Sequence, residues 1–111
     1  MGAPGFINGK HYTTYVEDVR ALKRNGQFDQ AVTLLLQLVG ATEAEARAKR
    51  WGVAPWYYEQ LAIIYAKTKQ LVPEIEILER YEKQPKAPGG GPSKLAERLA
   101  KTRRRAISCL E

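Results

Sequence analysis

The sequence has few of the residues that most often carry catalysis or bind metals. Its 111 residues include one cysteine, Cys109, and one histidine, His11. A single cysteine excludes an internal disulfide and fits a reducing compartment. A zinc site needs several cysteine or histidine ligands, and none lies near His11 in the sequence. We therefore expect a protein that is not an enzyme and that holds no metal and no cofactor, with Cys109 as a structural or idle thiol.

Carboxylates and glycines also lack a catalytic pattern. The glycine run at residues 89–91 has no Lys-Ser/Thr pair after it and follows no strand, so it does not predict a phosphate-binding loop. Carboxylates on expected helices usually form solvent-exposed faces with nearby lysines and arginines. We expect this of Glu43, Glu45, Glu74, Glu76 and Glu79.

Hydrophobic runs long enough to cross a bilayer are missing too. The apolar stretch at residues 34–36, continued by Leu38 and Val39, is far too short to span one. The N-terminal residues MGAPGFINGK lack the apolar core of a secretory signal. These absences predict a soluble, cytoplasmic protein with no membrane partner.

Helical periodicity recurs along the chain, whereas no segment has the alternation of a strand. The second periodic segment is apolar nearly all round, which predicts an elongated helix packed on more than one side, with a break at Gly40 as the alternative. The chain is therefore predicted to be all-α, with about five helices. Their expected bounds are 12–24, 29–50, 55–68, 73–83 and 94–109.

Proline and glycine residues separate these helices and divide the chain into four parts. Residues 1–10 are predicted to be a flexible N-terminal arm, and residues 11–84 a domain of helical hairpins. Residues 85–92 hold three consecutive glycines between prolines, which predicts a linker. Residues 93–111 are predicted to be a basic amphipathic helix that closes the domain, with Ser93 as its N-cap.

A weak internal repeat relates the two hairpins. In the first turn, Gly26 permits a tight reversal, Phe28 is expected to fill the gap between the helices, and the small Ala31 lets their backbones approach. The two hairpins align at a constant offset of 43 residues in three pairs: Val19 with Ala62, Leu22 with Tyr65, and Phe28 with Leu71.

These residues resemble the helix-turn-helix unit of tetratricopeptide repeats, over roughly residues 12–81. The sequence departs from that family in its period, which is usually about 34 residues. The additional residues fit the elongated second helix. In the second hairpin Lys69 replaces the turn glycine and Glu74 replaces the small alanine. The resemblance implies antiparallel helical hairpins whose first helices line a groove for a peptide or a partner protein.

The resemblance also assigns groove positions on the first helix of each hairpin. Val16 and Glu59 occupy two positions that the family's carboxylate clamp needs for other residues, so that clamp's specificity is not expected here. Trp56 is an anchor for a partner in one interpretation and packs into the core, against Trp51, in the other. The expected partner-binding residues are Arg20, Lys23, Arg24, Trp56, Glu59, Gln60, Ile63 and Lys67.

Positive charge gathers near the C-terminus. Residues 92–111 carry +4 of the formal net charge of +6, which favours acidic partners without choosing among them. A basic helix face can neutralise phosphates without reading sequence, and it can equally be the solvated face of a docked helix. The candidate nucleic-acid contacts are Lys94, Arg98, Lys101, Arg103, Arg104 and Arg105.

Two hypotheses of function follow from the sequence. The first is a non-enzymatic protein-protein interaction module, either an adaptor or a self-associating domain. It would bind a peptide segment or a partner protein, including an acidic one, or a second copy of itself as a homodimer. The alternative is nucleic-acid binding through the basic C-terminal helix.

Overall fold

The computed structural model describes residues 3–110, although the side chains of Cys109 and Leu110 lie outside the described part. The role expected for the Cys109 thiol therefore stays a prediction. The predicted all-α class with five helices is confirmed. Among the described residues, no helix combines the length and the apolar character that a membrane span requires. The helices are α1 (Val16–Arg24), α2 (Phe28–Lys49), α3 (Pro55–Lys67), α4 (Leu71–Glu82) and α5 (Gly91–Leu110).

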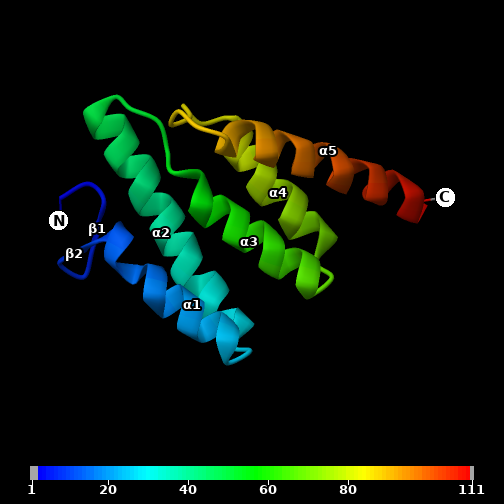
Figure 1. Ribbon diagram of the computed structural model, residues 1–111, viewed down its shortest axis with the longest axis horizontal. Coiled ribbons are helices and arrows are strands. Elements are labelled where there is room, and N and C mark those ends of the chain that lie inside the picture. The colour runs from blue at the N-terminus through cyan, green and yellow to red at the C-terminus, as the bar shows by residue number, and fades with distance from the viewer. Residues whose placement is uncertain (1–2, 111) are drawn as a thin grey trace.

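The five helices follow one another across the molecule in chain order, and the two ends of the chain lie at opposite ends of it (Figure 1). Helices α1 and α2 form one antiparallel hairpin, and α3 and α4 form the next. Helix α2 also packs on α3, and α5 packs on both α4 and α3. The layout is therefore two hairpins closed by a fifth helix.

Helix α2 runs without a break through Gly40, as the preferred interpretation predicted. Its two neighbours cover different sides of it, which explains why its sequence is apolar nearly all round. Leu35, Leu38 and Val39 of this helix are fully buried. Helix α5 adds Leu95 and Leu99, each 2% exposed, so it belongs to the same core.

The turns of the two hairpins have the same backbone geometry. Gly26 has a φ of +72° and Lys69, 43 residues later, has a φ of +59°, so both are left-handed. In each turn the next amide closes the helix end: Gln27 N–H donates to the Leu22 carbonyl at 2.9 Å, and Gln70 N–H donates to the Tyr65 carbonyl at 2.8 Å. These bonds are also 43 residues apart, so the repeat seen in the sequence extends to the hydrogen bonds of the turns.

The N-terminal segment differs from the flexible arm expected for residues 1–10. Strands β1 (Phe6–Ile7) and β2 (Lys10–His11) pair antiparallel, and β1 lies against α2. A short 3₁₀ helix, Tyr12–Tyr15, leads from them into α1. Strands of two residues are too short to show alternation, so the periodicity of the sequence could not predict them.

The expected linker at residues 85–92 is also partly structured. Val53 forms a parallel bridge with Lys86, and the Val53 N–H donates to the Pro85 carbonyl at 2.8 Å. Gly52 allows this approach, because a Cβ there would lie 2.1 Å from the backbone of residues 86 and 87. Helix α5 begins at Gly91, so Ser93 is not its N-cap. Likewise α4 begins at Leu71, because Pro73 is tolerated in a first turn, where backbone amides need no partner within the helix.

Three of the five glutamates that were expected to be solvated are buried. Glu43, Glu45 and Glu74 are 7%, 5% and 1% exposed. Glu43 accepts hydrogen bonds from Nε and Nη2 of Arg80, each at 2.8 Å, and from the Tyr58 hydroxyl at 2.7 Å, which ties α2 to α3 and α4. Burial and the Glu43 carboxylate both raise the pKa of Tyr58 well above its usual value, so Tyr58 remains a donor.

Lys69 gives a direct test of the left-handed turn. A residue with a Cβ is destabilised by about 1–2 kcal/mol in the left-handed conformation. Glycine avoids this strain, but it makes the unfolded chain more flexible and so offsets part of the gain. Lys69→Gly should therefore raise the free energy of unfolding by about 0.5–1 kcal/mol relative to Lys69→Ala. Urea unfolding followed by circular dichroism measures the difference, and a glycine variant no more stable than the alanine variant would contradict the turn geometry.

Phe28 is half-buried, not the fully buried residue that the sequence analysis expected, and the Lys67 ammonium lies 5.8 Å from the centre of its ring. Phe28→Ala should lower the free energy of unfolding by about 2 kcal/mol, below the range for fully buried aromatics, because part of the ring already contacts water. Val72→Ala is the control, since Val72 is 64% exposed. Equal losses in the two variants would show that Phe28 does not pack between the helices.

Candidate functional site

Side chains from α1, α3 and α5 meet on one surface, which we call the odd-helix face. Between α1 and α3, the Lys23 ammonium donates to the side-chain carbonyl of Gln60. The Arg20 guanidinium lies 6.0 Å from the centre of the Trp56 ring. Between α3 and α5, the Lys94 ammonium lies 2.8 Å from a Glu59 carboxylate oxygen. Five of the residues predicted from the sequence to bind a partner therefore contact another helix of this face.

The pKa of Lys23 is lowered by burial and by a neighbouring cation of this face. Lys23 is half-buried, and burial is the main cause of a pKa below the usual lysine value. The Lys67 ammonium lowers the pKa of Lys23 further, whereas the Glu59 carboxylate opposes this shift. The two lysines thus repel each other across α1 and α3, and an anion bound between them would relieve that repulsion.

Trp56 and Trp51 lie in different surroundings. Trp56 is half-buried at the start of α3, packs against the core and contacts the Tyr57 ring edge-on at 5.1 Å. Trp51 is 49% exposed, with the Lys49 ammonium 5.0 Å from its ring. Among the described residues the two tryptophans form no ring contact. Trp56 is therefore anchored by the core on one side and open on the other, which combines features of both interpretations.

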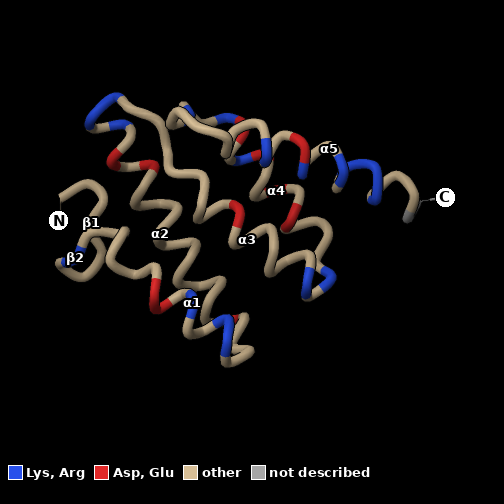
Figure 2. The backbone as a smooth tube through the Cα atoms, in the orientation of Figure 1, with Lys and Arg blue, Asp and Glu red and all other residues tan. Residues whose placement is uncertain are grey.

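The remaining predicted partner-binding residues occupy the edges of the face. Ile63 is half-buried on α3, one turn after Gln60. Arg24 is exposed at the end of α1, and Lys67 is exposed at the end of α3. Figure 2 shows lysines and arginines at the ends of α1 and α3 and along α5.

Helix α5 does not present one free basic stripe, because several of its cations bind carboxylates of this chain. Arg103 lies 3.0 Å from Glu79, and Arg105 lies 2.8 Å from Glu74, both of them on α4. Lys101 lies 3.6 Å from Glu97 on its own helix. With the Lys94–Glu59 pair, four of the six residues predicted to contact nucleic acid are paired internally. For Arg98 and Arg104, no carboxylate partner occurs among the residues that the structure describes.

Glu74 is the centre of the contact between α4 and α5. One terminal nitrogen of Arg105 donates to both Glu74 oxygens at 2.8 and 2.9 Å, and the buried Thr102 hydroxyl lies 3.1 Å from the second oxygen. Burying a carboxylate is costly unless it is paired and hydrogen-bonded, and Glu74 meets both conditions. This site was not predicted from the sequence, although one signal for it exists: Glu74 stands 43 residues after Ala31, where the repeat would place a small residue.

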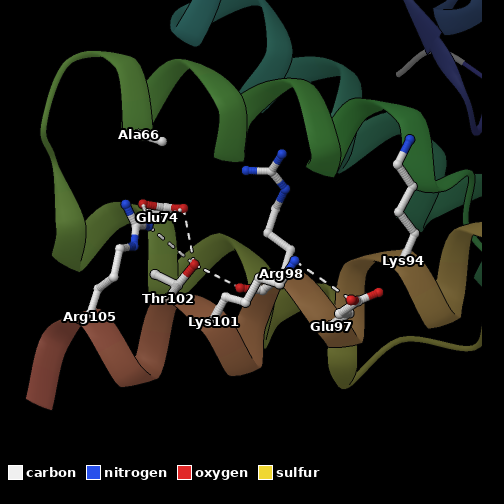
Figure 3. A pocket seen from close by; sticks show the side chains of 8 residues that line it. All are labelled: Ala66, Glu74, Lys94, Glu97, Arg98, Lys101, Thr102 and Arg105. Carbon is white, nitrogen blue, oxygen red and sulfur yellow. Dashed lines mark hydrogen bonds and ion pairs between the residues drawn. The ribbon is translucent and has the colours of Figure 1, made fainter.

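A cleft of about 430 Å³ lies along the junction of α5 with α3 and α4. Arg98 extends across it from α5 toward α3, as Figure 3 shows. A second hollow, of about 390 Å³, lies beside it near Trp56, and Lys94 lines both. The larger cleft is lined by Ala66, Glu74, Lys94, Glu97, Arg98, Lys101, Thr102 and Arg105.

The chemistry that this arrangement offers is recognition of anions and of apolar groups. Guanidinium and ammonium groups bind carboxylates and phosphates, and the half-buried Trp56 borders the smaller hollow. Among the side chains that the structure describes, no three of His, Cys, Asp or Glu gather in a way that could hold a metal ion.

The docking of α5 can be tested at Glu74. Arg105→Gln should lower the free energy of unfolding by about 1–2 kcal/mol, because it leaves a buried carboxylate unpaired. The loss should stay below the full cost of breaking a buried pair, since the Arg105 side chain is 53% exposed.

The double variant Glu74→Gln with Arg105→Gln should be more stable than Arg105→Gln alone, because it removes the unpaired charge and keeps the volume. Arg104→Gln is the matched control, and it should change stability by less than about 0.5 kcal/mol. Urea unfolding measures all four chains. A double variant less stable than the single one would argue against the buried carboxylate as the source of the loss.

Comparison with protein-family models, with curated proteins and with solved structures found no match for this chain. The function of the odd-helix face must therefore be inferred from its own residues.

Proposed function

We propose that the chain is a non-enzymatic protein-protein interaction module, similar in design to a tetratricopeptide repeat domain, that binds an extended segment of a partner protein across the odd-helix face. The observation that carries the proposal is the meeting of α1, α3 and α5 side chains from separate parts of the chain. Lys23 with Gln60, and Arg20 with Trp56, bring cations, an amide and an aromatic ring onto one surface.

The composition of this surface suits an interface. Tryptophan and arginine are the residues most often found at energetic centres of protein interfaces, and a half-buried Trp56 is already held in place by the core. Gln60 and Lys23 offer hydrogen bonds that can orient a peptide backbone or a polar side chain. Ile63 adds apolar area between them and the end of α3.

Nucleic-acid binding through α5 is the alternative, and the ion pairs of α5 weigh against it. A protein binds nucleic acid tightly when several of its cations neutralise phosphates at the same time. On α5, Arg103 and Arg105 already bind carboxylates of α4. A phosphate would therefore have to compete with these carboxylates for the two arginines. Exposed glutamates on the same edge, such as Glu82, would repel it.

Selection of peptides from a random library on the immobilised chain tests the proposal. The selected peptides should share a consensus, and their affinity should fall by about tenfold or more in Trp56→Ala and in Gln60→Ala, because both remove contacts at the centre of the face. Gln37→Ala, exposed on α2, is the control and should leave affinity unchanged. Fluorescence anisotropy measures affinity, and circular dichroism confirms that each variant is folded.

The outcomes separate the candidate functions. Failure to select any peptide, or equal affinity in the two variants and the control, would contradict peptide binding by this face. Binding of a short DNA duplex that weakens steeply with salt and disappears in Arg103→Gln with Arg104→Gln would favour the nucleic-acid alternative instead. Sedimentation velocity of the same samples shows whether the bound partner is a second copy of the chain.

A further inference from the structure

Arg98 differs from the other cations of α5 that line the cleft. Lys94, Lys101 and Arg105 each have a carboxylate within 4 Å, at 2.8, 3.6 and 2.8 Å. Arg98 is half-buried, extends into the cleft toward α3, and has no ion-pair partner among the residues that the structure describes (Figure 3). A partly buried guanidinium that lacks a counter-charge loses hydration without gaining a partner, so an anion in the cleft would stabilise it.

The charge around Arg98 is positive after internal pairing. Arg105 and Glu74 neutralise each other at one end of the cleft, as do Lys94 and Glu59 at the other. The Lys101–Glu97 pair is longer and well exposed, so solvent weakens it. The Arg98 charge therefore remains uncompensated, in a cleft whose walls include uncharged protein atoms that raise the strength of electrostatic interactions above that in water.

A second cationic centre lies on the other side of α3. Ala66 lines the Arg98 cleft, and the next residue, Lys67, lies near enough to Lys23 of α1 to lower its pKa. The C-terminal half of α3 thus separates two positive sites, one shared with α1 and one shared with α5. A ligand that contacts both sites would need carboxylates spaced along its backbone, with apolar groups near the half-buried Ile63 of the same helix.

A peptide carboxylate fits the cleft better than a polyphosphate chain. Arginine binds a carboxylate through two parallel hydrogen bonds, and the cleft holds one such uncompensated arginine. Glu97 lines this cleft and Glu59 lines the neighbouring hollow, so a continuous row of phosphates would have to compete with both carboxylates for Lys101 and Lys94. A peptide can place neutral residues opposite these glutamates.

We propose that the cleft between α3 and α5 is a carboxylate-binding subsite, in which Arg98 binds an acidic side chain of the partner segment while Lys23 and Lys67 bind another. This assignment rests on the proposed function and adds the chemistry of the partner, an acidic segment with spaced carboxylates. Arg98 is the residue that determines specificity for the acidic group at the α5 end.

The test uses the full chain and two fluorescein-labelled peptides, one of alternating Glu and Leu residues and one with Gln in place of every Glu. The Glu peptide should bind and the Gln peptide should bind at least about tenfold more weakly. Arg98→Gln should reduce affinity for the Glu peptide by about tenfold or more, because it removes a charged partner within the cleft. Arg104→Gln is the matched control, since it removes the same charge from an exposed position of the same helix.

Each outcome decides the assignment. Equal losses in Arg98→Gln and Arg104→Gln would show attraction to net charge alone and would overturn the subsite. Equal binding of the Glu and Gln peptides would overturn it as well, as would displacement of the Glu peptide by equimolar DNA duplex. Thermal unfolding followed by circular dichroism checks that Arg98→Gln is folded. Arg98→Lys keeps the charge without the planar group, so its affinity for the Glu peptide should lie between those of the unchanged chain and Arg98→Gln.

Failure of the subsite and failure of the proposed function are distinguishable. Library-selected peptides that lose affinity in Gln60→Ala but not in Arg98→Gln would leave the odd-helix face as a peptide-binding surface and would overturn the Arg98 assignment alone. A selected consensus without acidic residues would do the same. Absence of binding by both the selected and the Glu peptides would overturn both.

Discussion

The left-handed residue between paired helices is the constraint on which the rest of the structure depends. A single residue with positive φ at Gly26, and another at Lys69, reverses the chain so sharply that each helix returns against the one before it. Because both turns share the same hydrogen bonds, the two hairpins have the same geometry at their closed ends. The second helix of the first hairpin then packs on the first helix of the second, and this places α1 and α3 where Lys23 can reach Gln60.

The charged side chains of the molecule fall into two groups. Most carboxylates near the core hold the fold together: Glu43 joins three helices, and Glu74 fixes α5. The cations that remain, above all Lys23, Lys67 and Arg98, lie on the odd-helix face and repel one another or have no counter-charge within the described residues. A net positive chain can therefore carry its uncompensated charge on one face without being uniformly basic.

Much of the fold could be predicted from the sequence, because helical periodicity, proline and glycine mark the helices directly. The uninterrupted α2 was the preferred of two interpretations, and Gly26, expected to permit a tight turn, is left-handed. The candidate site was only partly predictable. The groove positions of α1 and α3 were named, and Lys23 with Gln60 and Arg20 with Trp56 do meet. The pairing of α5 with Glu59, Glu74 and Glu79 was missed, since periodicity shows which face of a helix is apolar but not which neighbour covers its edges.

The offset of 43 residues has a consequence for the end of the molecule. Glu74 and Arg105 lie that distance after Ala31 and Ala62, two fully buried small residues. Small alanines let helices approach closely, whereas Glu74 and Arg105 are long side chains that form an ion pair between α4 and α5. At positions where α2 and α3 carry two small alanines, α4 carries a long glutamate and α5 a long arginine. The last helix is therefore attached through an ion pair at positions where the junction of α2 with α3 has small apolar side chains, so its attachment depends on charge more than that junction does.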